Sequence, residues 1–184
     1  MATVINKKSL VELKRVDPSK YNTDEWIINP ALPDRDKKYW KVIGDFVVEK
    51  NQNEREDFDA TVLEETIKTE KIVKNNNIDK KTAELIANGI FFNGEYFSLS
   101  QNAQSNWNAI QTAISSDVLT EADFPFEIST LDDDIYMLEW SQVPHFIATV
   151  IQTVATHLGV GRRLKKNVKL STTIEELDQI IDER

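Results

Sequence analysis

The chain has 184 residues, enough for one domain of ordinary size or for a domain with appendages. It is 40% hydrophobic and 29% charged, so it can bury a core, and its net charge of −9 argues against a general nucleic-acid-binding protein. Cysteine is absent, which excludes a disulfide scaffold, a thiol nucleophile and a Cys-ligated metal.

The first 36 residues are predicted to form an extended docking arm. Pro18, Pro30 and Pro33 interrupt any long helix and favour extended backbone before them. The arm is nevertheless rich in apolar side chains, which need a buried place on their own domain or on another chain. The candidate docking residues of the arm are Tyr21, Trp26, Ile27, Ile28 and Leu32.

Residues 37–78 are predicted to form a connector made of a hairpin and a charged helix. Two β-branched and aromatic runs within residues 39–49 flank Gly44-Asp45, a pair suited to a tight turn. A charged helix is expected over residues 54–74, ended by the three asparagines at 75–77.

Residues 79–184 are predicted to form an acidic α+β domain with a basic segment and a C-terminal helix. A short helix over 79–87 precedes two hairpins, within residues 90–99 and 126–140, the first turned by Asn-Gly. Each hairpin leads into a helix, the first capped by Ser100 and the second running from Ser141 to a stop at Gly159. Thr172 and Thr173 each offer a capping box for the last helix. The fold class expected is therefore α+β, with small β-hairpins each followed by helices (ββα units), an extended N-terminal arm and a C-terminal helix.

The negative charge is concentrated in one part of this domain. Residues 82–161 contain ten acidic side chains and no Lys or Arg, so their net charge is −10, while the rest of the chain sums to +1. A basic segment follows directly, and its candidate docking residues are Arg162, Arg163, Lys165 and Lys166. We expect this segment to meet an acidic protein surface, either the chain's own 82–161 region or that of a neighbouring copy.

No residue pattern supports catalysis, a metal or a cofactor. The two histidines, His145 and His157, lack the spacing of a zinc motif. The three acids at 132–134 are better explained as a solvated turn than as a Ca²⁺ loop, because they lack alternating ligands and a central glycine. We therefore expect a protein that is not an enzyme and that carries no cofactor and no metal.

The N-terminus lacks the apolar core of a signal peptide, and we expect no membrane-spanning segment. The chain is accordingly expected to be made in the cytosol, to remain soluble and to have no membrane or nucleic-acid partner.

Two stretches resemble proteins of tailed bacteriophages. The first joins residues 26–30 to the hairpin at 38–49 and the acidic helix start at 54–59, and it resembles a YWKV-x-GD-x-VVE segment of phage structural proteins; Lys50 departs from the family, which often has Met there. The second, from residue 89 to about 158, resembles a phage domain of unknown function common in tail-fibre and fibre-assembly genes. Its matches are Phe92-Asn93-Gly94, Phe97-Ser98-Leu99-Ser100 and Ile135-Tyr136-Met137-Leu138.

The resemblance implies a non-enzymatic virion structural protein, synthesised in the host cytoplasm, that acts as a connector or adaptor of the tail, baseplate or fibre-attachment region. Its partners would be other virion proteins and further copies of itself in a symmetric assembly. One alternative is a tail-fibre assembly chaperone that is not retained in the virion. A glycan-binding tail-tip module is a third reading.

Overall fold

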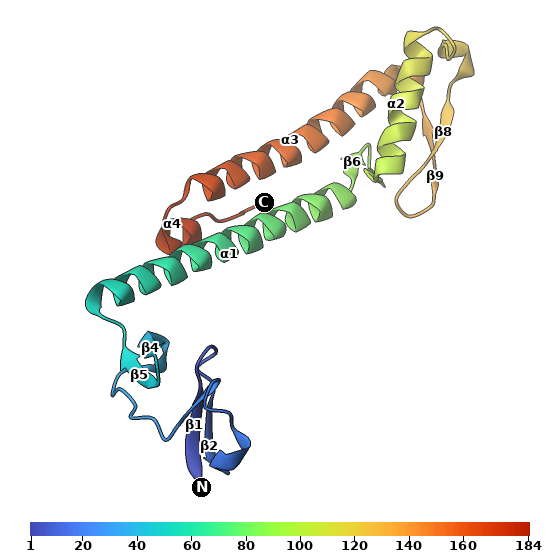
Figure 1. Ribbon diagram of the computed structural model, residues 1–184. Coiled ribbons are helices and arrows are strands. Elements are labelled where there is room, and N and C mark those ends of the chain that lie inside the picture. The colour runs from blue at the N-terminus through green and yellow to red at the C-terminus, as the bar shows by residue number, and fades with distance from the viewer. The chain divides into compact units, whose positions relative to one another are not determined.

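The computed structural model describes all of residues 1–184 and has 52% helix and 19% strand (Figure 1). Small antiparallel hairpins are interspersed with helices, so the α+β class is confirmed. The chain divides into two compact units, Met1–Thr66 and Ile67–Arg184. This division lies within helix α1 (Gln52–Ala87), whereas the sequence suggested boundaries after residues 36 and 78.

The first 36 residues form a small sheet, and the prediction of an extended arm is wrong for residues 2–28. Strands β1 (Ala2–Asn6), β2 (Glu12–Val16) and β3 (Trp26–Ile28) form an antiparallel sheet in the order β2-β1-β3. The chain can reverse after β1 because the Asn6 carboxamide oxygen accepts the backbone N–H groups of Lys8 and Ser9, each at 3.0 Å. Pro30 and Pro33 follow β3, so they interrupt no strand.

A second hairpin completes the core of the first unit. Strands β4 (Trp40–Ile43) and β5 (Phe46–Glu49) pair across the predicted turn, where Gly44 has a φ of +60°. The core consists of Ile5, Ile27, Trp40 and Val47. The N-terminal apolar residues therefore find their partner in the predicted connector hairpin, and residues 1–36 and 37–49 fold as one body.

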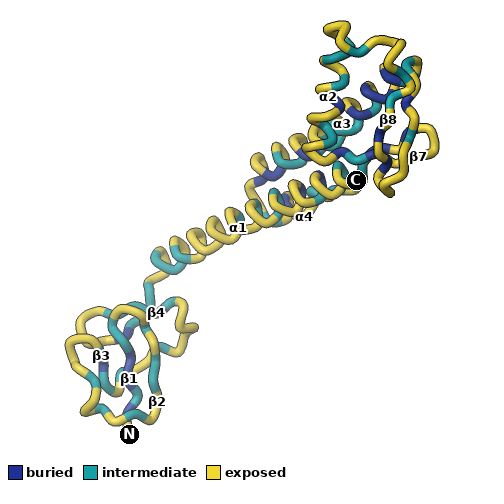
Figure 2. Tube along the Cα trace, turned by 90° about the vertical axis from the view of Figure 1, so that its right-hand side faces the viewer, coloured by how far each residue is buried: buried dark blue, intermediate teal, exposed yellow.

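Helix α1 continues for 36 residues, and the predicted break at the asparagines does not occur. Its start is fixed by a reciprocal pair of bonds, because the Asn51 side chain accepts the Glu54 N–H at 3.0 Å and the Glu54 carboxylate accepts the Asn51 N–H at 2.7 Å. Most of the helix is exposed, as Figure 2 shows, but Ile78 and Thr82 are buried within the second unit. That packing outweighs the weak helix propensity of asparagine.

The second unit contains the remaining elements. In chain order its strands and helices are β6 (Ile90–Phe92), β7 (Glu95–Phe97), α2 (Gln101–Ser115), β8 (Phe126–Ser129), β9 (Ile135–Leu138), α3 (Val143–Leu170) and α4 (Ile174–Asp178). Four short 3₁₀ turns complete the chain, at Pro18–Lys20, Lys37–Tyr39, Glu121–Asp123 and Trp140–Gln142. The two hairpins β6–β7 and β8–β9 form where the sequence predicted them.

The core of this unit is centred on Phe146 of α3, which is fully buried. Its ring meets those of Phe92, Phe97 and Trp107 edge to face, with centroids 4.9 to 5.1 Å apart. Helix α2 begins as predicted, with the Ser100 hydroxyl accepting the Ala103 N–H at 3.2 Å. The core thus ties both hairpins and α2 to the N-terminal half of α3.

Helix α3 continues past the predicted stop at Gly159 to Leu170. The reason is that Gly161 is buried against α1, where an added Cβ would lie 2.8 Å from the Thr82 hydroxyl. Glycine here permits close helix packing and does not end the helix. Beyond it Ile78, Val168 and Leu177 form a separate small core with α4. Of the two predicted capping boxes of α4, Thr173 with Glu176 is the one formed.

One helix bears on the expectation that no segment spans a membrane. Residues 140–161 carry no Asp, Glu, Lys or Arg, and the helical stretch Trp140–Leu170 is long and apolar enough to cross a bilayer by length and composition. A core helix of a folded protein passes the same test. One face of α3 packs in the core described above, through Val143, Phe146 and Val150.

Candidate protein-interaction site

The five predicted arm residues do not form one surface. Ile27 is buried in the core of the first unit, at 6% exposure. Tyr21 packs edge to face on Trp26 with centroids 5.0 Å apart, and both rings are partly buried, as is Ile28. Leu32 is exposed. The N-terminal sheet therefore buries, fully or in part, most of the apolar side chains that suggested docking on another chain.

The four basic residues lie on the last turns of α3. Lys165 pairs with Asp79 of α1 at 2.6 Å. Arg162, Arg163 and Lys166 are exposed and form no ion pair. The acid that meets this segment within the chain thus lies just outside the 82–161 region, and three positive charges stay available on the surface.

Two exposed apolar pairs, which the sequence reasoning missed, lie on hairpins. In the first unit Ile43 and Phe46 face each other across β4–β5 and are 57% and 72% exposed. In the second unit Phe91 and Tyr96 face each other across β6–β7, with rings 5.0 Å apart and more than half exposed. Strand alternation was the available signal, because Phe91 must face away from the buried Ile90 and Phe92.

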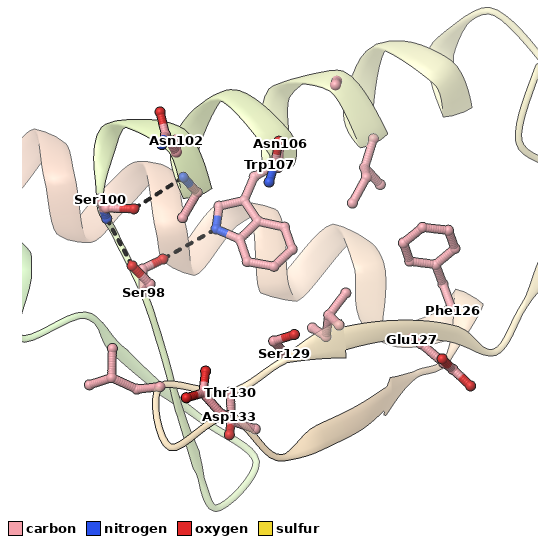
Figure 3. Close-up of a pocket in the computed structure, with 15 residues that line it drawn as sticks. Ser98, Ser100, Asn102, Asn106, Trp107, Phe126, Glu127, Ser129, Thr130 and Asp133 are labelled. Atoms are coloured by element: carbon pink, nitrogen blue, oxygen red, sulfur yellow. Dashed lines mark hydrogen bonds between the residues drawn. The ribbon is translucent and has the colours of Figure 1, made fainter.

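A groove of about 760 Å³ lies between α2 and β8 (Figure 3). Helix α2 forms one wall, and β8 with the two residues that follow it, 130 and 131, forms the other. Its floor is apolar and contains Trp107, Ile110 and Ile128. Figure 3 shows Trp107 extending from α2 into the space above β8.

Three hydrogen bonds hold one end of the groove in place. The Trp107 indole N–H donates to the Ser98 carbonyl at 3.4 Å, and the Gln104 amide donates to the Leu99 carbonyl at 2.7 Å. The Ser100 N–H donates to the Ser98 hydroxyl at 3.1 Å. The segment between β7 and α2 is therefore fixed to the helix wall, and the Trp107 ring nitrogen already has its partner.

The strand that forms the other wall has an open edge. The Thr130 N–H donates to the Asp134 carbonyl at 2.8 Å, so residues 130 and 134 are a hydrogen-bonded pair of the β8–β9 hairpin. Antiparallel alternation then directs the backbone groups of Ile128 towards β9 and those of Glu127 and Ser129 away from it. On this outer edge the Leu131 N–H meets the Tyr96 carbonyl at 2.7 Å, but no protein group bonds the Glu127 or Ser129 N–H.

The groove is polar at its margins and negatively charged. Serine, threonine and asparagine side chains surround it, together with the carboxylates of Glu127 and Asp133. No Lys or Arg lines it, since none occurs in residues 82–161. The arrangement suits a polar and cationic partner with apolar side chains for the floor.

The titratable side chains take part in local contacts. No three His, Cys, Asp or Glu side chains are placed to share a metal ion. His145 lies beside the Phe92 ring, with centroids 5.5 Å apart. Carboxylates with a perturbed pKa are explained by local structure: a side-chain hydrogen bond from Lys41 lowers the pKa of Glu54, and the Thr120 backbone N–H lowers that of Asp123.

Comparisons of the chain with protein-family models, with curated proteins and with solved structures each return no match.

Proposed function

We propose that this chain is a non-enzymatic structural protein of a tailed-bacteriophage virion, a connector or adaptor of the tail, baseplate or fibre-attachment region that is present in several copies. The support from sequence is the resemblance of the β4–β5 hairpin to a segment of phage structural proteins, and of residues 89–158 to a phage domain of unknown function common in tail-fibre and fibre-assembly genes. A structural protein needs interfaces and no catalytic site, and the exposed apolar pairs on the two hairpins are candidate interfaces.

The observation that carries the proposal is the division into two units, each with its own core and its own exposed apolar pair. Ile43 and Phe46 belong to the first unit, and Phe91 and Tyr96 to the second. Exposed apolar patches mark protein-interaction sites, and aromatic side chains are enriched at such interfaces. A chain with one such surface in each unit is suited to hold two partners.

The test uses the phage that encodes this chain, with single substitutions introduced into the gene. We expect Phe46→Ser to lower the number of copies per purified particle about tenfold or more, as loss of an interface anchor does. Val118→Ser is the matched control, because Val118 is also 72% exposed but lies outside both hairpin pairs. Copies are counted by quantitative mass spectrometry, and circular dichroism confirms that both variants fold.

Incorporation of the Phe46→Ser protein at the wild-type level would refute the role of the β4–β5 hairpin as an interface. If the wild-type chain is abundant in infected cells and missing from particles, the alternative role of a tail-fibre assembly chaperone holds instead. Both outcomes come from the same measurement.

A further inference from the structure

We propose that the open edge of β8 accepts an extended segment of another protein as an added strand, and that this segment carries apolar side chains at alternate positions and flanking Lys or Arg. The proposal rests on the proposed role in protein assembly and names how the second unit would hold its partner. Strand addition to an exposed sheet edge is an established mode of peptide recognition.

The first support is the hydrogen-bonding state of the edge. The backbone groups of Glu127 and Ser129 point away from β9 and have no protein partner. Leu131 is the next residue on the same edge, and it already bonds a neighbouring strand: its N–H donates to the Tyr96 carbonyl of β7 at 2.7 Å. Strand β7 therefore begins a pairing with this edge and leaves the rest of it open.

The second support is the shape of the groove beside this edge. The four residues of β8 span about 13 Å at roughly 3.3 Å per residue, which sets the length of the added strand at about four residues. Side chains of such a strand alternate, so every second one would face α2 and cover Trp107 and Ile110. The intervening side chains would face away from that floor.

The third support is charge. Glu127 and Asp133 line the groove, and the surrounding stretch of 80 residues has no basic side chain to balance them. A segment with Lys or Arg at its ends would be attracted to this surface at low ionic strength. Salt should weaken the attraction.

A second copy of this chain is a poorer occupant. Helix α2 borders the same edge, so a β8–β8 pairing across a two-fold axis would bring two copies of α2 into the space for one. It would also place the Glu127 carboxylates of both copies near each other without a compensating cation. A flexible segment of a different protein meets neither obstacle.

The test titrates the full chain with the synthetic peptide acetyl-Gly-Lys-Val-Thr-Ile-Lys-Gly-amide and follows binding by NMR. Two further peptides carry N-methyl groups, one on Val and Ile and the other on Thr. Only one set of alternate amides can face β8, so one methylated peptide should bind about tenfold more weakly or worse, and the other should bind about as well as the parent. Equal binding of all three, or no binding of the parent peptide, would overturn the proposal.

A variant of the protein tests the same edge from the other side. Ser129→Pro removes an N–H that β9 does not use, so the hairpin should survive while binding weakens about tenfold. Ser129→Ala keeps the N–H and should bind within about twofold of wild type. A peptide with Glu in place of both Lys residues should bind more weakly than the parent. Unchanged binding to Ser129→Pro would contradict strand addition, whereas the virion count of the Phe46→Ser protein would be unaffected by this result.

Discussion

Substitution of Gly161 by alanine should destabilise the second unit, although alanine is the better helix former. In a helix interior the exchange of glycine for alanine usually stabilises by about 1 kcal/mol. At this position the new methyl group would lie 2.8 Å from the Thr82 hydroxyl, closer than a Cβ can approach without movement. The clash falls on a buried side chain of α1, so the two helices must separate or the hydroxyl must move.

Both responses lower the free energy of unfolding. The Thr82 hydroxyl donates to the Ile78 carbonyl at 2.7 Å and accepts from the Arg184 guanidinium at 3.0 Å. Each of these bonds contributes about 1 kcal/mol or somewhat more, and overpacking of a close interface costs about 1–3 kcal/mol. After subtraction of the gain of about 1 kcal/mol in helix propensity, we expect Gly161→Ala to lower the free energy of unfolding by up to about 2 kcal/mol.

Gly159→Ala is the matched control, because it lies two residues away on the same helix and its methyl group would meet no atom within 4 Å. This variant should be more stable than wild type by about 0.5–1 kcal/mol. Urea unfolding followed by far-UV circular dichroism measures both. The double variant Gly161→Ala with Thr82→Ala should cost less than the sum of the single changes. Equal effects of Gly159→Ala and Gly161→Ala would refute the close-packing explanation for the continuation of α3.

Three further outcomes are expected. Phe146→Ala should destabilise the second unit by about 3–5 kcal/mol in urea unfolding, because the ring is fully buried among three others. Ser100→Ala should cost about 1 kcal/mol and reduce helicity, since the cap of α2 is lost; unchanged stability would contradict that role. Acid should weaken the fold: a side-chain hydrogen bond from Arg184 lowers the pKa of Asp182, so this stabilisation is present above the ordinary Asp value and is lost as pH falls below about 4. In Asp182→Asn, urea midpoints should fall less steeply over that range than in wild type.

The three two-stranded hairpins could be predicted because their signals are local. Asn93-Gly94 and Gly44-Asp45 supply the backbone conformations that their turns need, and Ser100 supplies a cap. These features require no knowledge of the rest of the chain.

The errors all concern contacts between distant residues. Asn75–Asn77 and Gly159 are weak helix formers, but packing of Ile78, Thr82 and Gly161 carries α1 and α3 through them. The sequence does not predict the N-terminal sheet because the core of that sheet depends on Trp40 and Val47, which lie beyond residues 1–36.

Most of the candidate site could not be predicted from the sequence, because it also depends on contacts between distant residues. An open strand edge depends on which strands pair, and the groove forms only when α2 packs beside β8. The charge segregation could be read directly, and it is the part of the sequence reasoning that still describes the groove.

The proposal that this chain connects phage virion proteins is tested most directly by its copy number in purified phage particles, measured by quantitative mass spectrometry after chemical crosslinking. The account predicts a fixed number of copies per particle, with crosslinks from the first and second units to different virion proteins. Absence from the particle, or crosslinks from one unit alone, would contradict a connector.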